Sequence, residues 1–63
     1  MKKLKEYLVN HGIKQNHFAK ELGLSESFIS EILKGKRAVP KKYWIKIVKY
    51  TMNEIKLEDF LEE

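Results

Sequence analysis

Gln15–Arg37, with the sequence QNHFAKELGLSESFISEILKGKR, predicts two short amphipathic helices joined by a sharp corner. In its first half, Phe18, Ala19 and Leu22 recur at i, i+1 and i+4, which places an apolar stripe on one face of a helix. Gly23 follows, and glycine adopts positive φ without the strain that a Cβ causes, as the residue just past a helix end often must. We therefore expect the first helix, which opens the stretch, to end at Leu22.

The second half of the stretch carries the signals of another helix. Ser25 supplies a hydroxyl that can accept from the free amides of a helix start, and Glu26 suits the positive end of the helix dipole. The apolar face consists of Phe28, Ile29, Ile32 and Leu33. Lys34 and Gly35 then form a basic-then-glycine stop, so we expect a helix over Ser25–Lys34. A helix, a glycine-containing turn and a second helix of these lengths make a helix-turn-helix.

The stretch also matches the spacing of a known family. Ala19 lies where two steeply crossing helices must touch, because a larger side chain would push them apart. The stretch resembles the helix-turn-helix proteins of the phage repressor and Cro type in the spacing of five residues: Gln15, Ala19, Gly23, Ile29 and Ile32. The resemblance extends through GKRAVPKKYWIKIVKYT, residues 35–51, and covers about residues 1–61. It implies an all-α, compact four- to five-helix domain of the lambda-repressor-like fold, which binds DNA.

A further helix is expected before this stretch, over about Lys2–His11, with Gly12 as its stop. Its apolar residues are Leu4, Tyr7 and Leu8. Lys14 precedes the first motif helix, where the family that the chain resembles more often has Ser or Thr as the cap. We therefore expect that helix start to be weakened by about 1 kcal/mol relative to a capped one.

The fourth helix is expected to begin at Pro40, because a first helical position does not need the missing N–H. Its inward stripe, at i, i+3, i+4 and i+7, consists of Trp44, Ile47, Val48 and Thr51. Asn53 can adopt the left-handed conformation and end the helix. A final helical turn is expected around four apolar residues of the acidic C-terminal segment 54–63: Ile55, Leu57, Phe60 and Leu61.

Composition points to one domain over residues 1–63, because a chain of 63 residues forms no more than that. It has no cysteine, no apolar run long enough for a membrane span and no signal-peptide pattern, so we expect a cytoplasmic protein. The charge is uneven. Residues 1–53 carry 12 Lys/Arg and 4 Asp/Glu (+8), whereas residues 54–63 carry 1 and 5 (−4), which together give the formal +4. A basic body with an acidic end suggests a polyanionic partner bound away from the C-terminus.

The outward face of the second motif helix is fixed once Ile29 and Ile32 point inward, because successive helical residues rotate by about 100°. The side chains expected to read base edges in a major groove are Ser27, Ser30, Glu31 and Lys34, with Glu26 at the edge of the face. Serine donates or accepts, glutamate accepts from the cytosine amino group, and lysine reaches guanine or a phosphate. The expected phosphate contacts are Gln15, Asn16, Lys36, Arg37, Lys41 and Lys42.

Enzymatic chemistry and a metal or other cofactor are not expected. His11 and His17 are the only histidines, and they lack metal-ligand spacing with a cysteine or each other. No serine has a histidine-plus-carboxylate pattern, and the glycines form no phosphate-cradling loop.

These observations predict a sequence-specific, double-stranded DNA-binding transcription regulator. The resemblance implies more narrowly a Cro-like repressor, acting in a prokaryotic or phage-infected cell on a palindromic operator. One helix covers only a few base pairs, so we expect a homodimer formed through Ile55, Leu57, Phe60 and Leu61. Ile55 and Phe60 could instead complete the monomer's own core. The alternative functions are the antitoxin or regulator of a toxin–antitoxin pair and a protein-binding adaptor. The carboxylates of Glu26 and Glu31 suit the adaptor, because they can also bind a protein surface.

Overall fold

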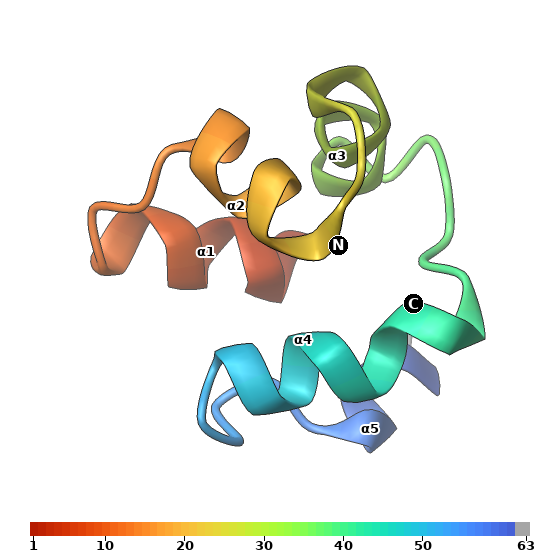
Figure 1. Ribbon diagram of the computed structural model, residues 1–63. Coiled ribbons are helices and arrows are strands. Elements are labelled where there is room, and N and C mark those ends of the chain that lie inside the picture. Colours follow the sequence, from red (N-terminus) through yellow and green to blue (C-terminus); the bar gives the residue numbers. More distant parts are fainter. Residues whose placement is uncertain (62–63) are drawn as a thin grey trace.

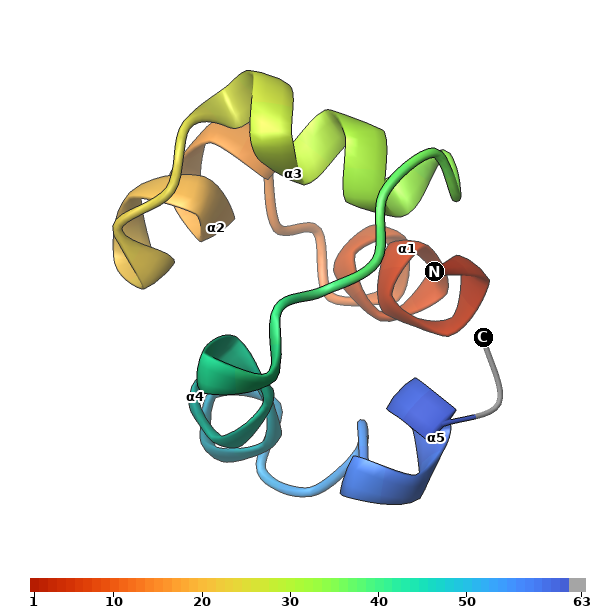
Figure 2. The ribbon, with the colours of Figure 1, turned by 90° about the vertical axis from the view of Figure 1, so that its right-hand side faces the viewer.

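Five α-helices and one 3-10 helix make up the regular structure of residues 1–61, the part of the chain that the computed structural model describes (Figure 1). The helices are α1 (Lys2–Asn10), α2 (Gln15–Leu22), α3 (Glu26–Leu33), the 3-10 helix η1 (Lys41–Tyr43), α4 (Trp44–Tyr50) and α5 (Leu57–Leu61). α2 and α3 lie at one end of the molecule, α4 and α5 lie at the other, and α1 runs between them (Figures 1 and 2). The predicted all-α helix-turn-helix fold is confirmed.

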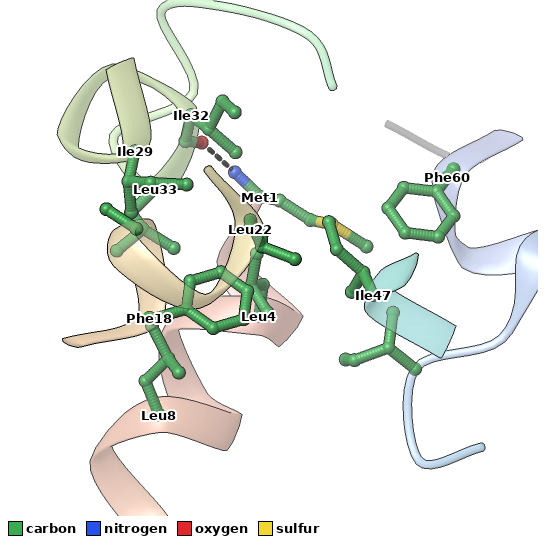
Figure 3. Close-up of a cluster of buried hydrophobic side chains, with 12 residues drawn as sticks. Met1, Leu4, Leu8, Phe18, Leu22, Ile29, Ile32, Leu33, Ile47 and Phe60 are labelled. Carbon is green, nitrogen blue, oxygen red and sulfur yellow. Dashed lines mark hydrogen bonds between the residues drawn. The ribbon is translucent and has the colours of Figure 1, made fainter. Parts of the chain in front are cut away.

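The core forms where these helices meet, and every α-helix contributes to it (Figure 3). Its buried members are Met1, Leu4, Leu8, Phe18, Ala19, Leu22, Ile29, Ile32, Leu33, Ile47, Ile55 and Phe60. The apolar stripes predicted for the first three helices therefore face inward. Trp44 is only partly buried, and its indole N–H donates to the carbonyl of Val39 at 2.9 Å, which satisfies the polar end of an otherwise apolar side chain.

The corner between α2 and α3 has the predicted chemistry. Gly23 adopts φ 74° and ψ 27°, in the left-handed region. Its N–H donates to the Lys20 carbonyl, and the Leu24 N–H donates to the Ala19 carbonyl, at 3.1 and 2.9 Å. This pair of bonds closes a Schellman motif. Ala19 is 2% exposed and belongs to the buried core, so a larger side chain there would displace its neighbours.

α3 begins with a side-chain cap, whereas α2 does not. The Ser25 hydroxyl accepts from the N–H of Phe28 at 3.1 Å, as predicted. Lys14 precedes α2 in an extended conformation and makes no side-chain cap hydrogen bond, which agrees with its being a poor capping residue.

The N-terminal residue has a structural role that the sequence pattern did not indicate. Met1 is 5% exposed, and its α-amino group donates to the carbonyl of Ile32, in the last turn of α3 (Figure 3). A positive charge at a helix C-terminus is favourable, because the last carbonyls carry the negative end of the helix dipole. The start of α1 and the end of α3 are thereby joined.

The fourth helix begins differently from the prediction. Pro40 has φ −59° and ψ 140°, which is extended, and its carbonyl accepts from the N–H of Tyr43 at 2.9 Å. A 3-10 turn therefore follows the proline, and α-helical geometry begins only at Trp44. At the other end, Asn53 is left-handed as predicted, and Met52 before it is left-handed too, with φ values of 70° and 53°.

The C-terminal segment packs on the domain. Ile55 and Phe60 are 1% and 8% exposed, and the Phe60 ring stacks on Trp44 with centroids 5.1 Å apart. These two residues complete the monomer's core, which is the alternative that the sequence left open. Leu57 and Leu61 are exposed, at 45% and 72%. Of the four residues expected to form a dimer surface, Ile55 and Phe60 are therefore buried within the monomer, and Leu57 and Leu61 remain exposed.

Asp59 fastens α5 to the rest of the chain. Its carboxylate accepts from the backbone N–H of Lys56 at 2.8 Å and pairs with Nζ of Lys3 on α1 at 3.0 Å. The bond from Lys56 is half of a capping box, in which a side chain inside the first turn reaches back to the amide before the helix. This backbone hydrogen bond, and next the hydrogen bond from Lys3, lower the pKa of Asp59 below its usual value.

The corner supports a first prediction. Gly23→Val should lower the free energy of unfolding by more than about 1 kcal/mol, because a β-branched residue resists positive φ. The matched control is Gly23→Asn, which tolerates the left-handed region and should cost less than half as much. Apart from Gly23 itself and its two neighbours in the chain, no residue has an atom within 4 Å of the position that a Cβ would take. A steric clash therefore does not complicate the comparison. Equal urea midpoints for the two variants would contradict this account of the corner.

Asp59 supports a second prediction. Because its pKa is lowered in the folded state, the ionised carboxylate stabilises the fold above the unfolded-state pKa of about 4. This contribution is lost as pH falls through the lower folded-state value. Asp59→Asn should therefore unfold at lower urea than wild type at pH 7, and the difference should shrink below about pH 4. Glu6→Gln, at an exposed carboxylate on α1, is the control. A difference that stays constant down to pH 2 would exclude an effect of the charge.

Candidate nucleic-acid interface

α3 is held with one face in the core and the other in solvent. Ile29 and Ile32 are 0% and 1% exposed, and Leu33 is buried beside them. The opposite face carries Ser27, Ser30, Glu31 and Lys34, with Glu26 in the first turn. At 1.5 Å per residue, the eight residues of α3 give a rod about 12 Å long. An α-helix with its side chains is about 10–12 Å across, so α3 fits a B-DNA major groove about 12 Å wide.

An open hollow of about 540 Å³ lies along this outward face. It is lined by Gln15, Glu26, Ser27, Ser30, Glu31, Lys34 and Lys36. All the side chains predicted to read bases thus share one surface with two of the predicted phosphate contacts. Together they offer hydroxyls, carboxylates, an amide and ammonium groups, so the surface can both donate and accept hydrogen bonds.

The start of α2 borders the hollow. Gln15 is its first residue and Asn16 its second, and both side chains are exposed. Because Lys14 makes no side-chain cap, the amides of this first turn stay available to an external acceptor. Free amides at a helix N-terminus, together with side-chain amides, suit a phosphate group.

The predicted basic contacts after α3 separate into two groups. Lys36 lines the hollow, whereas Lys41 and Lys42 belong to η1, which lies across the loop from α3 (Figure 2). The ammonium groups of these two lysines lie over the rings of Trp44 and Tyr43, at 5.9 and 5.4 Å from the ring centroids. Lys41 and Lys42 therefore do not line the hollow, unlike Lys36.

Arg37 contacts two side chains of α3, although it lies beyond the end of that helix. Its Nε donates to Oε1 of Glu31 at 2.9 Å, and its guanidinium carbon lies 4.7 Å from the centroid of the Phe28 ring. The helical spacing of Phe28 predicts a core position, but its ring is only partly buried and lies against the guanidinium of the arginine. The sequence offered no signal for this contact, because it depends on how the chain turns after α3.

His11, which lies outside this surface, has a structural partner. His11 pairs with Glu54 at 3.2 Å, which joins the end of α1 to the turn before α5. Among residues 1–61, no group of three or more histidine, cysteine or acidic side chains could hold a metal ion. In the same part of the chain, no helix is both long and apolar enough to cross a bilayer.

Comparison with known proteins agrees with this architecture. A family model described as helix-turn-helix matches residues 4–51, which spans α1 to α4 and more than half of the chain. Neither the curated proteins nor the solved structures contain a match to the chain.

Proposed function

This chain belongs to the helix-turn-helix family, a family of DNA-binding regulatory domains, and on that premise we propose that it is a sequence-specific transcription repressor of the Cro type. The observation that carries the proposal is the hollow along α3. Its lining combines the outward side chains of a helix whose other face is locked in the core. Such a helix can present a fixed pattern of donors and acceptors to base edges, which sequence-specific readout requires.

In the proposed complex, α3 enters the major groove of double-stranded DNA and the start of α2 meets the phosphate backbone. Ser27 and Ser30 donate to or accept from base edges, and Lys34 reaches guanine or a phosphate. Gln15, Asn16 and Lys36 fix the register through backbone contacts. Repression follows from occupancy, because a protein seated on an operator excludes polymerase or a rival regulator. Such a protein acts in the cytoplasm, at the nucleoid.

The proposed operator is a palindrome bound by a homodimer. One recognition helix covers only a few base pairs, and two-fold pairing doubles the contacts available for rejecting competing sites. Leu57 and Leu61 support a contact between copies, because both are exposed apolar side chains on one short helix. Leu57 also lines an open, largely apolar hollow between α4 and α5, together with Val48 of α4. A second leucine-bearing α5 has the chemistry to fill it.

A protein-binding adaptor is the second candidate, and the carboxylates of Glu26 and Glu31 favour it, because they repel phosphate. The ion pair between Glu31 and Arg37 weakens this argument, since it compensates one of the two negative charges. Salt separates the candidates. Operator binding should weaken steeply with ionic strength, because counterions are released from the duplex, whereas adaptor binding should not.

Selection from random duplex DNA tests the proposal directly. We expect enrichment of a palindromic site whose half-sites lie about 34 Å apart, or one helical turn. The bound fragments are sequenced after successive rounds at moderate salt. Enrichment of a single unpaired half-site would support DNA recognition by a monomer, and no enrichment at all would exclude the proposed function.

The dimer contact has its own test. Leu57→Glu combined with Leu61→Glu should abolish cooperative binding to the palindrome and leave affinity for an isolated half-site unchanged, because both residues are exposed. Point variants are preferable to removing residues 55–63, since that deletion would also remove Ile55 and Phe60 from the core. Val9→Glu, at an apolar residue of α1 that is 69% exposed, is the matched control. Wild-type cooperativity in the double variant, measured by titration and sedimentation, would place the contact elsewhere.

A further inference from the structure

We propose that Arg37 is a base-reading residue, held beside α3 by Glu31 and Phe28 so that its guanidinium recognises a guanine in the bound DNA. The inference rests on the proposed function and deepens it. It moves Arg37 from the phosphate contacts, where its position after the helix would place it, to the residues that determine sequence preference. Glu31 and Phe28 become positioning residues.

The path of the chain brings Arg37 back to α3. Gly35 adopts φ 77°, and its N–H donates to the Ile32 carbonyl at 3.1 Å. The N–H of Lys36 donates to the Glu31 carbonyl at 2.9 Å, which completes a second Schellman motif. The chain therefore reverses as soon as α3 ends. Arg37, although it lies beyond the helix, can place its side chain along the helix flank.

Two contacts fix the guanidinium there. Nε donates to Oε1 of Glu31 at 2.9 Å, and the central carbon lies 4.7 Å from the Phe28 ring centroid. Phe28 and Glu31 are three residues apart on α3, so their side chains are neighbours on the helix surface. The charge of Arg37 is thus carried next to the base-reading face, because Glu31 itself lines the hollow.

The terminal nitrogens of the Arg37 guanidinium, which do not bond to Glu31, can recognise a base. Within residues 1–61, the hydrogen bond to Glu31 is the one that the guanidinium makes, and it uses Nε. The two terminal nitrogens keep their N–H groups in one plane, and this planar fork matches O6 and N7 of guanine. The cation–π contact with Phe28 and the hydrogen bond to Glu31 restrict the side chain before DNA binds, which lowers the entropy cost of the contact.

Stability does not account for the arrangement. The side chains of Arg37 and Glu31 are 51% and 47% exposed, and an ion pair of that exposure contributes little to folding. A phosphate contact does not require it either, because a carboxylate partner weakens the attraction between a cation and the DNA backbone. Orientation of a planar donor is the role that both contacts serve. The ion pair between Arg37 and Glu31 also explains how a glutamate can lie on a helix that approaches DNA, because the arginine compensates its negative charge.

The test compares site preferences of Arg37→Ala, Arg37→Lys, Glu31→Ala and the Arg37→Ala/Glu31→Ala double variant, using selection from random duplexes and titration of the selected site. Arg37→Ala should lower the preference for guanine at one position of each half-site by about 5- to 150-fold, as expected for loss of a bidentate contact. Arg37→Lys should not restore it, since lysine lacks the planar fork. Glu31→Ala should weaken the same position, and the double variant should be no worse than Arg37→Ala.

Lys36→Ala is the matched control, because Lys36 is the adjacent cation and lines the hollow. It should weaken binding to all sequences alike and reduce the salt slope by about 0.9, as one lost phosphate contact does. The same uniform loss in Arg37→Ala, with rescue by lysine, would overturn the proposal in favour of a phosphate contact. Additive effects of Arg37→Ala and Glu31→Ala at two different base positions would overturn the positioning role of Glu31. Failure of the wild type to enrich any site would instead refute the proposed function itself, and thermal melts confirm that each variant is folded.

Discussion

Burial of Ile29 and Ile32 is the constraint from which the geometry of α3 follows. Both side chains are almost completely buried, so the helix cannot turn about its axis without opening a cavity. Truncating one such residue to alanine costs about 2–5 kcal/mol in a packed core, a large share of the stability of a domain this small. The outward face is therefore fixed by the inward one. Ala19 is buried in α2, and the Met1 amino group ties the end of α3 to α1.

The local parts of this fold could be predicted from the sequence because their chemistry is local. A glycine at a left-handed position, a serine at a helix start and an alanine at a close crossing each act within a few residues. The residues around the hollow could also be predicted, since the helical rotation that buries Ile29 also determines what faces outward. These are the features that agree between sequence and structure.

The remainder depends on contacts that no local pattern encodes. The sequence shows four apolar residues near the C-terminus, but the shape of the core decides that Ile55 and Phe60 are buried and Leu57 is not. The position of Arg37 requires a reversal after α3 and a partly buried phenylalanine in the right place. Such details follow only when all helices are placed together.

Carboxylates of the acidic C-terminal segment 54–63 also make structural contacts in the folded protein. Asp59 pairs with Lys3, and Glu54 pairs with His11, so two of its carboxylates lie against α1. α5 lies at the end of the molecule opposite α3 (Figure 2). The ion pair between Asp59 and Lys3 therefore compensates a positive charge at a distance from the hollow, whereas the hollow has two lysines and two glutamates of its own.

The position of Trp44 gives the protein a built-in optical reporter. It is the single tryptophan of the chain, it donates to Val39 in the loop, and it stacks on Phe60 of α5. Its fluorescence therefore follows the packing of the C-terminal half, whereas circular dichroism follows all the helices together. Coincident transitions by the two signals would mean that the corner and the C-terminal helices unfold as one cooperative unit. Separate transitions would mean that α4 and α5 can detach while the helix-turn-helix stays folded.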